Sequence, residues 1–138
     1  MTEENSESVY TNEQRNLLLK GIVSFQNGDY FEAHDLIEEA WQELRGNPKI
    51  FWQAVIQLSV SFYHFSSGNR SGATGLARKA NLKINSLPAF FNPEIKSDFL
   101  NLTSEWSNLS HIAEMPEFPP EIVTELKRLL TPDLLNEK

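Results

Sequence analysis

The stretch at residues 51–65, FWQAVIQLSVSFYHF, constrains the fold more than any other part of the sequence, because it is apolar nearly all round. Projected onto a helix, it places large apolar side chains on two different faces. Such a helix has to be covered on most sides by other segments. We therefore expect a central helix that begins near residue 48 and is stopped by Gly68.

Capping and stop signals divide the remaining chain into further helices, and no segment alternates with the period of a strand. Capping-box patterns at Thr11 with Gln14 and at Asp29 with Glu32, and the pair Asn47-Pro48, mark helix starts. We predict helices at about 12–26, 30–45, 48–67, 71–87, 93–108 and 120–130. Because the connections between the first four helices are short, the fold class is all-α, an up-and-down helical bundle of four core helices plus one or two C-terminal covering helices.

The length and composition predict one domain. With 138 residues and 40% hydrophobic content, the chain can bury one core but is short for two ordinary domains. We expect a flexible N-terminus over residues 1–10, a helical core over 11–88, and a C-terminal helical extension over 89–133 packed on the same domain.

Composition also excludes several functional classes. The chain has no cysteine, which rules out disulfides and thiolate sites and fits a reducing compartment. It has no apolar run near the length of about 18 residues that a membrane span needs, and its polar, acidic start is unlike a targeting peptide. We therefore predict a cytoplasmic protein without membrane contact.

The net charge of −7 argues against nucleic-acid binding, which needs clustered Lys and Arg. The charge is uneven, because residues 44–93 carry +6 with no acidic residue and the remainder carries −13. Two interpretations stay open for the basic segment. It either complements the acidic helix before it, or it meets an anionic small molecule or a protein partner.

Two polar groups on the predicted helix 30–45 are candidates for a site. His34 and Glu38 are one turn apart on its inward edge, near Trp41, whereas Asp35 and Glu39 face solvent. On the central helix a polar stripe has to meet polar partners, because buried polar groups are costly when unpaired. If the two helices are antiparallel, Glu38 is level with the middle of that stripe. The predicted polar cluster is His34, Glu38, Trp41, Gln57 and His64, with Gln53 and Ser61 on the same stripe.

Three roles remain open for this cluster. It can be a hydrogen-bonded network that fixes helix register, or a small ligand-binding pocket. We therefore favour the interpretation that the protein is a ligand-binding or structural/interaction module. The alternative is a metal-dependent, hydrolase-like enzyme, because His34, Glu38 and His64 match ligand sets of Zn²⁺ and non-haem iron. The sequence does not decide whether the protein is an enzyme or which cofactor, if any, it holds.

Three short motifs resemble one known family. They comprise Gly28, Tyr30, His34, Glu38 and Trp41, then Ile56, Gln57 and His64, then Gly68, Asn69, Gly72 and Ala73. Together they resemble the bacterial and plant family called domain of unknown function 309, over residues 20–88. Asp35 replaces the usual glutamate, and Ala54-Val55 replaces a glycine-containing pair. The resemblance implies an all-helical fold and no particular reaction.

Overall fold

The computed structural model describes residues 9–88, 91–108 and 120–135, and this part of the chain contains helices and no β-strand. The elements are α2 (Asn12–Gln26), α3 (Tyr30–Trp41), α4 (Gly46–Ser66), α5 (Arg70–Asn85), α6 (Pro93–Ser107), α7 (Pro120–Leu129) and the 3-10 helix η2 (Pro132–Leu135). The all-α prediction is confirmed. The predicted flexible N-terminus lies almost wholly outside the described residues, and the division into core and extension stays a prediction.

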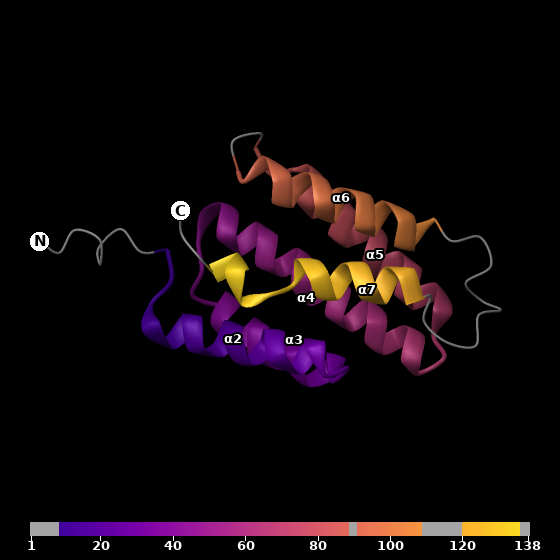
Figure 1. The fold of residues 1–138 in the computed structure, drawn as a ribbon, viewed down its shortest axis with the longest axis horizontal. Coiled ribbons are helices and arrows are strands. Elements are labelled where there is room, and N and C mark those ends of the chain that lie inside the picture. The colour runs from indigo at the N-terminus through magenta and orange to yellow at the C-terminus, as the bar shows by residue number, and fades with distance from the viewer. Residues whose placement is uncertain (1–8, 89–90, 109–119, 136–138) are drawn as a thin grey trace, which may run out of the picture.

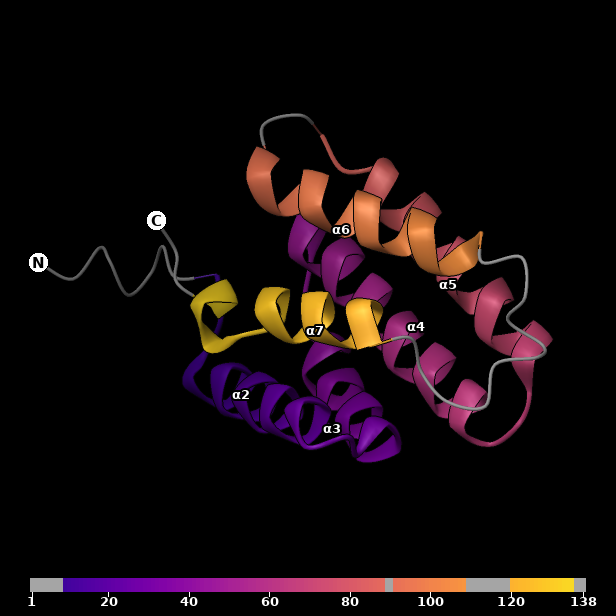
Figure 2. The ribbon, with the colours of Figure 1, turned by 45° about the vertical axis from the view of Figure 1, so that its right-hand side comes forward.

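Consecutive helices from α2 to α6 pack against each other, as their short connections require. The interface of α4 with α5 is the most extensive, and α3 covers another side of α4. Figures 1 and 2 show α7 lying across α4, between the α2–α3 pair and α6. None of the described helices has the length and apolar character needed to cross a membrane.

Helix α4 is the centre of the core, as its sequence predicts. Its buried side chains include Phe51, Trp52, Ala54, Val55, Leu58, Phe62 and Phe65. Ser61, also fully buried, joins three helices: its hydroxyl donates to the carbonyl of Ala73 on α5 and accepts from Trp106 Nε1 on α6 at 2.8 Å. The buried hydroxyl of Ser61 therefore has both a hydrogen-bond acceptor and a donor.

Local signals set most helix ends. The Thr11–Gln14 capping box is present, with both reciprocal bonds formed. Gly28 and Gly68 follow α2 and α4 with φ of 86° and 92°, a left-handed conformation that favours glycine. After each glycine, the next backbone N–H returns to a carbonyl of the last turn, at 2.8 Å in both cases. The predicted stop at Gly68 is confirmed, and Gly28 ends α2 in the same way.

Two predicted ends around the α3–α4 turn are wrong. Helix α3 ends at Trp41 rather than near residue 45, because Glu43 and Leu44 donate to carbonyls only three residues back. Helix α4 begins at Gly46, with Arg45 before it and no side-chain cap, so Asn47 is not the cap. Asp29 is the N-cap residue of α3, as predicted, but its side chain does not form the expected capping bond.

Side chains of α2 hold the C-terminal segment in place. Gln26 Nε2 donates to the carbonyls of Lys127 and Leu130, at 3.1 and 2.7 Å, where α7 ends. Arg15 donates to the carbonyl of Leu135 at 2.9 Å. The last carbonyls of a helix lack partners within it, so the bonds from Gln26 cap α7 from a distant part of the chain, while Arg15 holds the end of η2.

Replacing Ser61 tests the junction of three helices. Ser61→Ala leaves Trp106 Nε1 buried without its acceptor, so we expect the free energy of unfolding to fall by about 1–3 kcal/mol in urea titrations. Ser66→Ala is the matched control, because that exposed hydroxyl bonds only to its own helix. Equal effects of the two substitutions would contradict this account of the core.

Candidate functional site

Ring contacts fix the register of α3 against α4. Tyr30 packs edge-on against Phe62 with ring centroids 5.4 Å apart, and Phe31 lies 5.2 Å from Tyr63. The start of α3 therefore meets the end of α4, as an antiparallel pair requires. Burial raises the pKa of the Tyr30 hydroxyl above its ordinary value, so this hydroxyl is neutral at physiological pH.

His34 has a fixed tautomer. Its Nδ1 lies 3.0 Å from the carbonyl oxygen of Phe31, which can only accept a hydrogen bond, so Nδ1 carries a proton. In the neutral ring the lone pair is then on Nε2, which lies 3.6 Å from Glu38 Oε1. The His34 side chain is 18% exposed and the Glu38 side chain 47% exposed. The pair thus lies at the surface edge of α3 rather than in an enclosed cluster.

A third carboxylate joins this pair. Asp35 Oδ1 is 3.6 Å from His34 Nδ1, and its side chain is 60% exposed, as predicted. Within the described residues, His34, Asp35 and Glu38 form a group whose candidate ligand atoms all lie within 4.8 Å of one another. That group does not include His64. The structure therefore places Asp35, and not His64, with the predicted His34–Glu38 pair.

Two exposed aromatic rings separate His34 from His64. The His34 ring is 5.1 Å from Phe31, Phe31 is 5.2 Å from Tyr63, and Tyr63 is 6.2 Å from His64. Phe31 is 53% and Tyr63 40% exposed, which is unusual for large aromatic residues. We call these four residues, His34, Phe31, Tyr63 and His64, the ring row.

The other members of the predicted cluster have separate environments. Trp41 Nε1 donates to the carbonyl of Lys49 at 2.9 Å, and Lys49 Nζ lies 4.4 Å from the centroid of the Trp41 ring. Trp41 thus fastens the turn between α3 and α4. Ser61 faces α5 and α6 instead of α3, so it does not continue the predicted stripe toward His34. His64 Nδ1 is 3.5 Å from Asn69 Nδ2 beyond the end of α4.

Gln57 has an unpaired oxygen. Its side-chain Oε1 is buried and has no hydrogen-bond partner among the residues that the structure describes. A buried carbonyl oxygen without a donor is costly, and it marks a place where a ligand or water would be stabilised. The sequence places Gln57 on the polar stripe of the central helix, and no hydrogen bond joins its Oε1 to any described residue, Glu38 included.

The chain is thus a small all-α protein. Its surface carries a group of one histidine and two carboxylates beside exposed aromatic rings. Residues 18–76 match the family described as Domain of unknown function (DUF309), which confirms the resemblance seen in the sequence. The match covers α2 from Leu18, the whole of α3 and α4, and the start of α5.

Two curated proteins are similar to parts of this chain. The chain is 43% identical over 49 residues to the Uncharacterized protein YpuF of Bacillus subtilis (strain 168), covering 35% of this chain and 28% of that protein. It is 22% identical over 110 residues to an Uncharacterized protein of Aquifex aeolicus (strain VF5), covering 79% of this chain and 33% of that protein. The chain therefore spans a third or less of these relatives. No solved structure matches it.

The unpaired oxygen of Gln57 leads to a stability prediction. We expect Gln57→Leu to be neutral or to raise the free energy of unfolding by up to about 1 kcal/mol, because it removes a buried acceptor without breaking a bond. Urea denaturation measures the change, with Gln53→Leu, one turn earlier and partly buried, as the control. A clear loss of stability confined to Gln57→Leu would show that the amide holds the fold together.

Proposed function

We propose that the chain is a binding module and that the ring row is its contact surface. The single observation that carries the proposal is the exposure of Phe31 and Tyr63 side by side, at 53% and 40%. Adjacent exposed aromatic side chains are typical of surfaces that become buried in complexes, where they contribute strongly to affinity. A merely structural role would not require either ring to face water.

The charges around the ring row favour a protein partner. Asp35 and Glu38 border the row, and their carboxylates would repel an anionic small molecule. Protein interfaces, by contrast, commonly combine aromatic side chains at the centre with polar groups around the rim.

Site-specific photocrosslinking tests this proposal. A photoreactive phenylalanine analogue at position 31 should form adducts with a defined partner in the native cells, and an added Tyr63→Ala substitution should reduce their yield. The control position is Leu82, which is 64% exposed on α5. Adducts that form equally well from position 82, or none from position 31, would refute the ring row as a contact surface.

A second candidate is a divalent-cation site at His34, Asp35 and Glu38. The specific observation is the bond from His34 Nδ1 to a backbone carbonyl, because metal-binding histidines usually use their other nitrogen in this way. The separation of 3.6 Å between Nε2 and Glu38 Oε1 also fits. Two ligand atoms on one tetrahedral zinc ion lie about 3.4 Å apart. The hydrolase-like alternative depends on this site, since it requires a metal to activate water.

Thermal melts with added Zn²⁺, Mn²⁺ and Fe²⁺, on protein purified without an affinity tag, test the cation site. At a free concentration of one hundred times the dissociation constant, a bound cation stabilises the native state by about 2.7 kcal/mol. We expect His34→Ala to abolish the shift and His64→Ala to preserve it, because His64 is outside the group. No shift in the parent, or an equal shift in His34→Ala, would remove both the metal site and the hydrolase alternative.

A further inference from the structure

A second surface lies along the exposed side of the α2–α3 pair, on the other flank of α3 from the ring row. Each helix contributes one stripe with spacings of four, three and four residues, which places the members on one face. The stripes are Glu13, Leu17, Lys20 and Ser24 on α2, and Glu32, Leu36 and Glu39 on α3, with Glu43 in the turn that follows α3. We call the groove between these stripes the outer seam.

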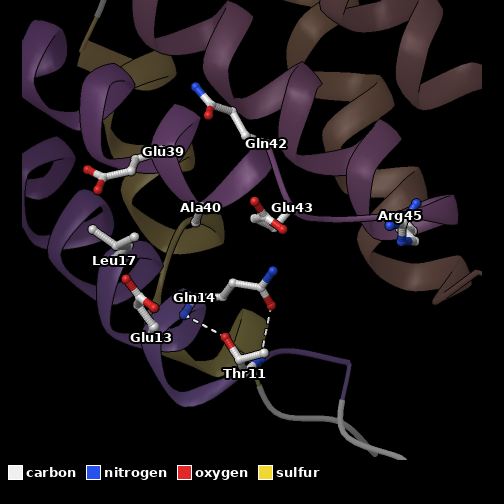
Figure 3. A pocket seen from close by; sticks show the side chains of 9 residues that line it. All are labelled: Thr11, Glu13, Gln14, Leu17, Glu39, Ala40, Gln42, Glu43 and Arg45. Carbon is white, nitrogen blue, oxygen red and sulfur yellow. Dashed lines mark hydrogen bonds between the residues drawn. The ribbon is translucent and has the colours of Figure 1, made fainter.

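Two hollows occupy the outer seam, one toward each end. The first, of about 510 Å³, has Leu17 and Ala40 among its lining residues and carboxylates around them (Figure 3). The second, of about 490 Å³, is lined by Leu19, Val23 and Leu36 with Lys20 and Glu32 beside them. Val23 is 54% exposed, so apolar surface along this groove faces water.

The rim of the outer seam is mainly acidic. Its two hollows are lined by the carboxylates Glu13, Glu32, Glu39 and Glu43, against the two cations Lys20 and Arg45. Within the described residues, none of these four carboxylates forms an ion pair. The apolar side chains of Leu17, Val23 and Leu36, bordered by unpaired carboxylates, are complementary to an apolar surface bordered by basic side chains.

The shape of the outer seam suits a helix. Helix α2 has 15 residues, which corresponds to a groove of about 22 Å, or four helical turns. Ridges spaced by three and four residues on both walls match the ridges of a third helix packed between them. A second copy of this chain is a poorer occupant, because its acidic rim would face the rim of the first, and the net charge is −7.

We propose that the outer seam binds an amphipathic helix of a protein partner, with lysine or arginine residues along both edges of its apolar face. This interaction is independent of the ring row, because the two surfaces lie on opposite flanks of α3 and share no residue. The apolar face of the partner covers Val23 and Leu36, and its basic residues pair with Glu39 and Glu43.

Two synthetic peptides test the proposal. Both have about 18 residues and the same leucine-rich apolar face, but one has lysine and arginine at its edges and the other has glutamate. Fluorescence anisotropy at roughly 0.15 M salt, where distant charges are screened, measures their affinity for the intact chain. We expect the basic peptide to bind at least about tenfold more tightly than the acidic one.

Variants of the chain locate the interaction. The double variant Glu39→Lys with Glu43→Lys should reverse the preference between the peptides, and Val23→Asp should weaken binding of both. The control is Glu94→Lys with Glu105→Lys on α6, which changes the net charge equally away from the seam. Circular dichroism verifies that each variant is folded.

The outcomes are distinct. Loss of binding in the α6 control as large as in the seam variant would show attraction to net charge alone and would overturn the proposal. Equal affinity for the two peptides would overturn it as well. Analytical sedimentation of the chain without peptide tests whether a second copy occupies the outer seam. A dimer that Val23→Asp abolishes would assign the outer seam to a second copy instead.

Discussion

Helix α4 has to be covered along its length, and the arrangement of the other helices follows from that requirement. An apolar helix gains free energy only when neighbours remove its surface from water. Helices α3 and α5 pack beside it, and α7 lies across it. Where α4 carries a polar group inside, as at Ser61, the neighbours supply the partners, and Trp106 and the Ala73 carbonyl tie α6 and α5 to it.

The fold class and most helix ends could be predicted because they depend on short-range chemistry. A capping box at Thr11 and Gln14, or a left-handed glycine at Gly28, acts within a few residues and is visible in the sequence. The α3–α4 turn was mispredicted because a tertiary bond acts there. Trp41 Nε1 bonds to the Lys49 carbonyl across the turn, and the local cap signal at Asn47 does not set the start of α4.

The candidate site could be predicted only in part, for a similar reason. His34 and Glu38 meet because both are on one helix, where a spacing of four residues fixes their proximity. His64 is on another helix. Helical periodicity predicts its position along the helix axis more reliably than the direction in which its side chain points. Phe31 was overlooked because apolar residues are assigned to a core by default. Its place on the polar flank of α3, beside Asp35, was the signal that could have revealed it.

The capping of α7 by Gln26 has a consequence for the order of folding. Contacts between consecutive helices close short loops, so they form early and at low entropic cost. The bond from Gln26 to the Leu130 carbonyl joins residues 104 positions apart and has to await the approach of a distant segment. We expect α7 to dock after the earlier helices have packed, and until then its apolar residues Ile122 and Leu126, which are buried in the native fold, are open to water. Docking of α7 therefore removes an apolar surface through which unfolded chains could associate.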